Sequence, residues 1–180
     1  MQYYLVALFD NKSYNLIEPI QKALSKKYNL YKDLPKLHIT LTVIEDPNIE
    51  SLNKALQNIL SSYSKFKVEL KDVICFGEPF KSVNLKVNSN GFIKELSRIL
   101  CKKLKELGFN VTNNPDTWDL HVSLANTNFA KRIWDKAEFE SACEKVKTEG
   151  FYNIAEIESL ELWKPINDEK EMVVLKFPLK

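Results

Sequence analysis

The sequence predicts a mixed α+β fold of two similar lobes that pack as one unit, and three observations lead to this prediction. The chain has 180 residues, of which 44% are apolar and 28% charged, values typical of a globular domain. Two pentapeptides, at residues 37–41 and 120–124, are nearly identical: LHITL and LHVSL. In each half, an apolar strand-like run precedes a helical pattern that leads to the pentapeptide. We therefore interpret residues 1–180 as a single two-lobed domain, with repeat one at about 1–77 and repeat two at about 78–180.

The first repeat begins with a strand-like apolar run at residues 4–9. A helix is expected next, at about 15–28, with Pro19 in its opening turn. Its apolar face consists of Ile20, Ala23, Leu24 and Tyr28. After the first pentapeptide, Pro47 is expected to open another helix. The inward face of that helix consists of Ile49, Leu52, Leu56, Ile59 and Tyr63, and a strand at about 66–76 follows.

The second repeat follows the same order, with a strand-like run at residues 83–87 and a helix at about 92–107. The apolar stripe of this helix consists of Leu96, Ile99, Leu100, Leu104 and Leu107, and Gly108 supplies its C-terminal stop. After the second pentapeptide, a weaker helical pattern includes Phe139, Cys143 and Val146. Strands are expected at about 154–163 and 172–177. No segment has the composition of a flexible linker.

The charge of the chain limits what it can bind. Lys and Arg number 26 against 24 Asp and Glu, which leaves a formal charge of only +2. This excludes a surface that is basic throughout, such as many proteins use to bind duplex nucleic acid. Only Arg98 and Arg132 are arginines, so lysine has to make most cationic contacts with phosphate.

The cysteines and the N-terminus favour a cytoplasmic protein without a membrane segment. Cys75, Cys101 and Cys143 are far apart and show no C-x-x-C or zinc-ligand spacing, so we expect reduced thiols in apolar settings. The apolar run at residues 4–9 is shorter than the core of a signal peptide and lacks a basic segment before it.

The two pentapeptides carry the residues best suited to chemistry. Residues two apart in a strand point to the same face, so His38 and Thr40 emerge together, opposite the apolar residues of their motif. The same holds for His121 and Ser123. A histidine in a strand is most often a hydrogen-bonded structural residue, but these are the only two in the chain and they occupy matching places in a duplication. We therefore expect both to be catalytic.

Two imidazoles that face one cleft can act as an acid–base pair at neutral pH. The hydroxyls of Thr40 and Ser123 can donate hydrogen bonds to the non-bridging oxygens of a phosphate, where charge develops during a displacement. This combination favours phosphoester chemistry. Two histidines without neighbouring cysteines or clustered carboxylates do not make a metal site, so neither metal nor cofactor is expected.

On these motifs, the chain resembles the two-histidine (2H) phosphoesterase superfamily, which is defined by a duplicated His-apolar-Ser/Thr-apolar tetrapeptide. Residues 38–41 and 121–124 match it in full, and the similarity is greatest to the bacterial 2′-5′ RNA ligase and cyclic phosphodiesterase branch. The resemblance implies a bilobal α+β fold of two pseudo-symmetric repeats, with antiparallel-rich sheet, outer helices and a metal-free central cleft. It also implies hydrolysis of 2′,3′-cyclic phosphates on RNA 3′ ends or small nucleotides to 2′-phosphates.

Further residues are candidates for substrate binding. Lys36 shares the strand face of His38 and can supply a cation, whereas Asp119 occupies the matching place before His121. Asn126 stands shortly after the second motif, where members of the RNA ligase branch often have arginine. Trp118, Trp163, Tyr3 and Phe80 are candidate surfaces for base stacking, although most aromatic residues belong to the core. Lys164 lies at a strand end, where the resembling family often has a phosphate-binding polar residue.

The leading hypothesis is a metal-independent phosphodiesterase in which one histidine activates water and the other protonates the leaving ribose oxygen. The sequence leaves open which histidine has which role. A non-catalytic module that binds RNA ends or nucleotides is an alternative, and so is RNA 2′-5′ ligation in the same site. A monomer is favoured.

Overall fold

A computed structural model describes all residues, 1–180, and its elements repeat one order. The first half contains β1 (Gln2–Phe9), α1 (Asn11–Tyr28), β2 (Ile39–Glu45), α2 (Ile49–Leu60) and β3 (Phe66–Phe76). The second half contains β4 (Ser82–Val87), α3 (Phe92–Glu106), β5 (Asn110–Val111), β6 (His121–Ala125), α4 (Lys136–Glu149) and β7 (Tyr152–Trp163). The chain ends with α5 (Glu169–Met172) and β8 (Val173–Pro178). Apart from β5, both halves read β-α-β-α-β, as the duplication predicts.

The starts of α1 and α2 differ from the expected ones because side-chain caps decide them. The carboxylate of Asp10 accepts a hydrogen bond from the backbone N–H of Ser13, so α1 begins at Asn11 rather than near residue 15. Pro19 consequently lies inside α1, not in its opening turn. Asn48 caps α2 in the same way, and α2 ends at Leu60, before the expected inward-facing Tyr63.

All strands belong to one sheet in which every pairing is antiparallel. The strand order is β1-β2-β6-β4-β3-β7-β8, and β5 pairs with β2. Because β1 also pairs with β7, the path of pairings from β1 through β7 returns to its start. The mixed α+β class and the antiparallel sheet predicted from the sequence are confirmed.

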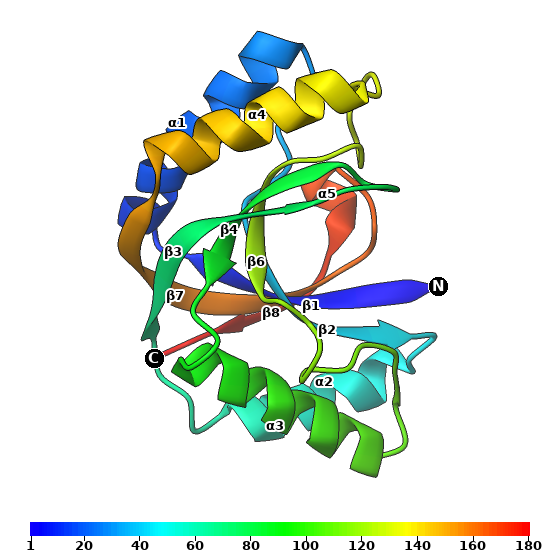
Figure 1. Ribbon diagram of the computed structural model, residues 1–180. Coiled ribbons are helices and arrows are strands. Elements are labelled where there is room, and N and C mark those ends of the chain that lie inside the picture. The colour runs from blue at the N-terminus through cyan, green and yellow to red at the C-terminus, as the bar shows by residue number, and fades with distance from the viewer.

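The helices cover the sheet from two sides. Figure 1 shows α1 and α4 together above the strands and α2 and α3 together below them. Helix α1 contacts β6 of the second half, and α3 contacts β2 of the first half. Each strand that carries a histidine motif is therefore supported by the helix that precedes the other motif. No helix in the structure is both long and apolar enough to cross a membrane.

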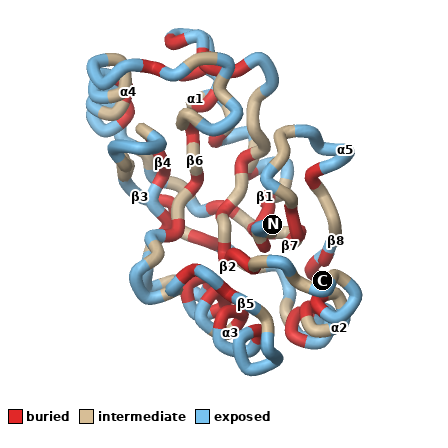
Figure 2. The backbone as a smooth tube through the Cα atoms, turned by 90° about the vertical axis from the view of Figure 1, so that its right-hand side faces the viewer, coloured by how far each residue is buried: buried red, intermediate tan, exposed pale blue.

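The two faces of the sheet differ in polarity. One face and the inner sides of the helices form the main core, and Figure 2 shows buried residues gathered along the strands and these inner sides. A second, small apolar cluster contains Val6, Leu8, Trp163 and Met172. Because Val6 and Leu8 alternate with core residues of β1, this cluster lies on the other face of the sheet.

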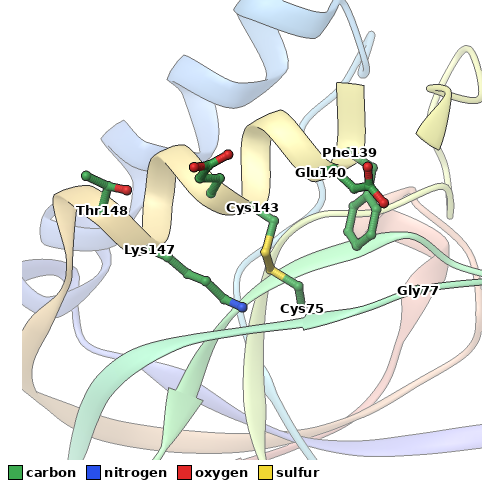
Figure 3. Close-up of a pocket in the computed structure, with 8 residues that line it drawn as sticks. Cys75, Gly77, Phe139, Glu140, Cys143, Lys147 and Thr148 are labelled. Atoms are coloured by element: carbon green, nitrogen blue, oxygen red, sulfur yellow. A yellow bond between two sulfur atoms is a disulfide. The ribbon is translucent and has the colours of Figure 1, made fainter. Parts of the chain in front are cut away.

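The expectation of three reduced cysteines is wrong for two of them. Cys75 of β3 and Cys143 of α4 form a disulfide, whereas Cys101 is a free, buried thiol. The bonded pair is separated by 68 residues, and only the packing of α4 against β3 brings the two thiols together. A shallow pocket of about 510 Å³ lies beside the disulfide (Figure 3). The two bonded cysteines line this pocket together with Phe139, Glu140 and Lys147. The cytoplasmic location stays a prediction.

Candidate active site

The two histidine motifs meet where β2 and β6 pair. The central isoleucine of the first motif lies opposite the central valine of the second, in antiparallel register. In this register each histidine falls opposite the hydroxyl residue of the other motif, so that His38 faces Ser123 and Thr40 faces His121. Because neighbouring residues of a strand alternate, all four side chains lie on the face opposite the main core.

The burial of the motifs confirms the alternation predicted from the sequence. The four polar side chains, His38, Thr40, His121 and Ser123, are all partly exposed. The apolar residues are at most 3% exposed and belong to the main core: Leu37, Ile39, Leu41, Leu120, Val122 and Leu124. The motifs are therefore anchored in the core by their apolar side chains, and their polar side chains lie on the other face of the sheet.

Each imidazole makes an equivalent hydrogen bond to a backbone carbonyl. Nδ1 of His38 lies 2.7 Å from the carbonyl oxygen of Lys36, and Nδ1 of His121 lies 2.7 Å from that of Asp119. Since a carbonyl can only accept, Nδ1 carries the proton in each ring. In the neutral form, Nε2 of each histidine is then an unprotonated nitrogen, which can accept a proton.

Each imidazole also meets an aromatic ring edge-on. His38 lies 4.6 Å from Trp163, at the end of β7, and His121 lies 5.2 Å from Phe76, at the end of β3, between ring centroids. These strands hold matching places in the two halves, so each half supplies the aromatic contact for the histidine of the other. The indole N–H of Trp163 donates to the buried carboxylate of Glu161 at 2.7 Å, which fixes its ring.

The surroundings of the two histidines are not equivalent. Burial lowers the pKa of His38 to about 4, against the opposing effect of its bond to Lys36, and the nearby positive charges of His121 and Lys36 lower it further. Burial also lowers the pKa of His121, but its bond to Asp119 and the negative charge of that residue both raise it. His121 therefore holds a proton more readily than His38.

Neighbouring strands also differ in the residues that they place beside the two histidines. Lys86 of β4 pairs with His121 of β6 and is exposed on the same face. On the other side, β1 pairs its Ala7 with Ile39, so the next residue, Leu8, lies beside His38. One histidine thus adjoins a free ammonium group, and the other adjoins the small apolar cluster.

Ser123 has a side-chain partner that Thr40 lacks. The amide nitrogen of Asn126 donates to Oγ of Ser123 at 2.7 Å. The hydroxyl of Tyr31, which follows α1, in turn forms hydrogen bonds with both the backbone N–H and the backbone carbonyl of Asn126. Asn126, a substrate-binding candidate from its position after the second motif, thus has its side chain in contact with a motif residue.

The other sequence candidates fall into two groups. Lys36 is half-buried beside His38, Trp163 packs on His38 with only 5% of its surface exposed, and Lys164 is half-buried after it. Tyr3 and Trp118 instead pack against the main core, which the motif side chains face away from. The structure thus places Lys36 and Trp163 beside His38, and it does not bring Tyr3 or Trp118 beside the imidazoles.

Sequence reasoning missed Phe76, Lys86 and Tyr31. Phe76 could have been found from the duplication, because it ends the third strand of its half as Trp163 does. Lys86 could have been found from the alternation of β4, where it follows the buried Asn84 by two residues, but only the strand order shows that β4 lies beside β6. No local signal marks Tyr31.

No group of three or more His, Cys, Asp or Glu side chains in the structure is arranged to hold a metal ion.

A family model described as the 2′-5′ RNA ligase superfamily matches residues 9–169. This chain belongs to the 2′-5′ RNA ligase superfamily. The match covers most of the chain and confirms the resemblance to the 2H phosphoesterases drawn from the two motifs. No curated protein sequence matches the chain.

Solved structures show the same fold at low sequence identity. TT0787 of Thermus thermophilus has a TM-score of 0.65 and 16% identity, with 99% of this chain and 98% of that chain covered. A structure described as a phosphoesterase has a TM-score of 0.61 and 14% identity, with 99% and 98% covered. LigT of E. coli, complexed with ATP, has a TM-score of 0.58 and 13% identity, with 99% and 97% covered. At these identities, the likeness shows the fold of this 2′-5′ RNA ligase superfamily member, and it does not show its substrate.

Proposed function

We propose that this protein is a metal-independent phosphoesterase that hydrolyses 2′,3′-cyclic phosphates of RNA ends or nucleotides to 2′-phosphates. The observation that carries the proposal is the crosswise register of the two motifs, which puts two imidazoles and two hydroxyls on one sheet face. Nδ1 of each imidazole is hydrogen-bonded to a backbone carbonyl, so Nε2 of each ring is available for proton transfer.

In the proposed reaction, water attacks the phosphorus in line with the bond to the 3′ oxygen. One Nε2 accepts a proton from the water as its oxygen bonds to phosphorus. The bond to the 3′ oxygen breaks, and the other histidine gives its Nε2 proton to that oxygen. The hydroxyls of Thr40 and Ser123 donate to the non-bridging oxygens, where negative charge increases.

The unequal surroundings of the histidines favour one assignment of roles. His38 is the less easily protonated ring, which suits a base that must be neutral before the reaction. His121 holds its proton more readily because of the carbonyl and the carboxylate of Asp119, which suits the acid. We therefore assign the water proton to His38 and the leaving-group proton to His121.

Lys86 is the cation that the second motif itself lacks. Its ammonium group is exposed on the reacting face, and the strand register sets it next to His121. A lysine at this place attracts the phosphate as a point charge without needing the planar geometry of arginine. We assign Lys86 to phosphate binding, with Lys36 as a second cation on the side of His38.

The test is turnover of 2′,3′-cyclic mononucleotides and of short RNAs with cyclic phosphate ends, in excess EDTA, with the phosphate position in the product determined. We expect 2′-phosphate products and undiminished rates with EDTA. His38→Ala and His121→Ala should each lower turnover at least about 10²-fold, and the double variant little further. Loss of activity in EDTA that a divalent ion restores would contradict the metal-independent reaction.

Two alternatives share this site and are separated by the same assay. RNA 2′-5′ ligation would use a 5′-hydroxyl RNA end in place of water, so adding such an acceptor should yield a joined product. A binding module would show saturable binding of the cyclic phosphate with no product, and the histidine variants would then change only affinity.

A further inference from the structure

We propose that Asn126 is a positioning residue, which aims the hydroxyl proton of Ser123 at the substrate phosphate, and that Tyr31 holds Asn126 in place. This inference rests on the proposed function, because it assigns Ser123 as a donor to the phosphate.

The orientation of the Asn126 amide follows from its two contacts. The backbone N–H of Asn128 donates to one side of the amide at 2.7 Å, so the atom on that side is the oxygen. The other atom is then the nitrogen, and it lies 2.7 Å from Oγ of Ser123. A backbone N–H cannot accept, so the reverse orientation of the amide would leave two donors facing each other.

This bond determines what the serine hydroxyl can do. An amide nitrogen has no lone pair to accept with, so Oγ of Ser123 must be the acceptor. Its own proton is therefore free to be donated elsewhere. In the proposed complex, a non-bridging phosphate oxygen is an acceptor on this face, so Asn126 orients Ser123 as a donor before the substrate binds.

Tyr31 fixes the backbone on which this amide is mounted. Its hydroxyl accepts from the backbone N–H of Asn126 at 2.7 Å and donates to the backbone carbonyl of Asn126 at 2.9 Å. Tyr31 is only 8% exposed, and burial raises its pKa to about 12, so at neutral pH the hydroxyl keeps the proton that it donates. The backbone N–H of Lys131 also donates to the carbonyl of Leu30, at 2.7 Å, which ties the two segments together a second time.

The arrangement serves only one of the two motif hydroxyls. Asn126 lies three residues after Ser123, and the residue three places after Thr40 is the buried, apolar Val43. Val43 offers no side-chain donor, so Thr40 has no equivalent support. The structure therefore supplies an internal control, because a change at Asn126 should act through Ser123 and not through Thr40.

The experiment is a set of three double-mutant cycles on kcat and KM for a 2′,3′-cyclic mononucleotide. Asn126→Ala should lower kcat about 10-fold, less than the 10²–10³-fold lost with a direct transition-state donor, and change KM less than about 2-fold. In the Ser123→Ala background, the same change should lower kcat less than about 2-fold. In the Thr40→Val background, it should keep its full effect. Tyr31→Phe should show the same dependence on Ser123, with a smaller loss.

Asn128→Ala is the matched control, since Asn128 contributes only its backbone N–H to the arrangement, and alanine keeps that group. It should leave kcat at the parental value. Asn126→Ala with parental kcat would overturn the inference. So would a loss that persists unchanged in the Ser123→Ala background, because Asn126 would then act on the substrate or on the fold directly.

If the proposed hydrolysis is wrong, the experiment gives a result that differs from failure of the positioning role. If the parent shows no turnover, the same cycles are run on the Kd of adenosine 2′-monophosphate, where Ser123 would donate to the same phosphate. Non-additive losses in Kd would then support the positioning role without hydrolysis. A parent that neither turns over the cyclic nucleotide nor binds the 2′-phosphate would overturn both proposals.

Discussion

Protonation of His38 should destabilise the folded protein, and this can be measured without knowing the substrate. The folded chain holds its pKa near 4, against 6.5 for an unperturbed histidine, so the unfolded chain binds this proton more readily. Stability should therefore be fully present above pH 6.5 and fall as pH decreases from 6.5 toward 4. Linkage with these two pKa values gives a loss of at most ~1.8 kcal/mol between pH 7 and pH 5. Because the ring is partly exposed, solvent screening reduces this, and we expect about 1 kcal/mol.

The perturbation is His38→Asn, whose amide nitrogen takes the place of Nδ1 and keeps a donor for the carbonyl of Lys36. The side chain cannot titrate, so the variant should lose about 1 kcal/mol less stability than the parent between pH 7 and pH 5. The assay is urea unfolding of both proteins at each pH, with the free energy of unfolding extrapolated to water. Titration of groups that do not interact with His38 affects both proteins alike and cancels in the comparison.

His121→Asn is the control for position. Burial lowers the pKa of His121 as well, but the bond and the charge of Asp119 oppose it, so this variant should differ from the parent in the same direction and by less. Parallel pH dependence of the parent and His38→Asn would refute the reasoning, because His38 would then titrate alike in the folded and unfolded chains. A larger effect at position 121 than at position 38 would reverse the proposed acid and base.

Three further predictions test the strand faces, the cation and the disulfide. Thr40→Val should lower kcat by an amount equivalent to about 1–4 kcal/mol of transition-state stabilisation, with little change in Tm. Ile39→Ala, at a fully buried site, should destabilise the fold by about 2–5 kcal/mol and leave the folded fraction active. The opposite pattern would mean that the motif faces the other way. Lys86→Ala should raise KM for cyclic phosphates and weaken its salt dependence, with Lys86→Arg retaining most affinity; an unchanged KM would remove Lys86 from the site. Cys75→Ser should destabilise by about 2–4 kcal/mol under oxidising conditions and little in reductant, and the absence of Cys75–Cys143-linked peptides in mass spectrometry would contradict the bond.

The fold is predictable from this sequence because its elements carry regular patterns from end to end. The strand expected at 66–76 and the helix expected at 92–107 agree with β3 and α3 to within one residue. The start of α1 is not predictable in this way, because it depends on one hydrogen bond that the Asp10 side chain accepts from the backbone N–H of Ser13, not on periodicity. The short β5 and α5 have too few residues to show any period.

The site is predictable only as far as local alternation reaches. It places His38 and His121 with their hydroxyl neighbours on one face, and the burial pattern confirms this. Alternation contains no information on which strands become neighbours, so the contact of Phe76 with His121 and the place of Lys86 depend on the strand order β6-β4-β3. The same limit hides the disulfide, whose two cysteines lie on elements that are joined only by packing.

Duplication alone would produce a symmetric site, and a symmetric site is poorly suited to a reaction that needs one base and one acid. Antiparallel pairing of two copies of one motif gives each histidine the hydroxyl of the other copy, so the motifs supply equal parts. The difference must come from residues outside them, and the structure shows it at each matching place around the pair. On the side of the first histidine are Lys36, Leu8, Trp163 and Val43, and on the side of the second are Asp119, Lys86, Phe76 and Asn126. Burial and the positive charge of Lys36 disfavour a proton on His38, whereas the bond to Asp119 and its negative charge partly offset the same effect of burial at His121. In the proposed reaction, the direction of proton transfer would therefore depend on residues around the motifs, where the two halves differ, while the shared pentapeptides would provide the groups that exchange the proton.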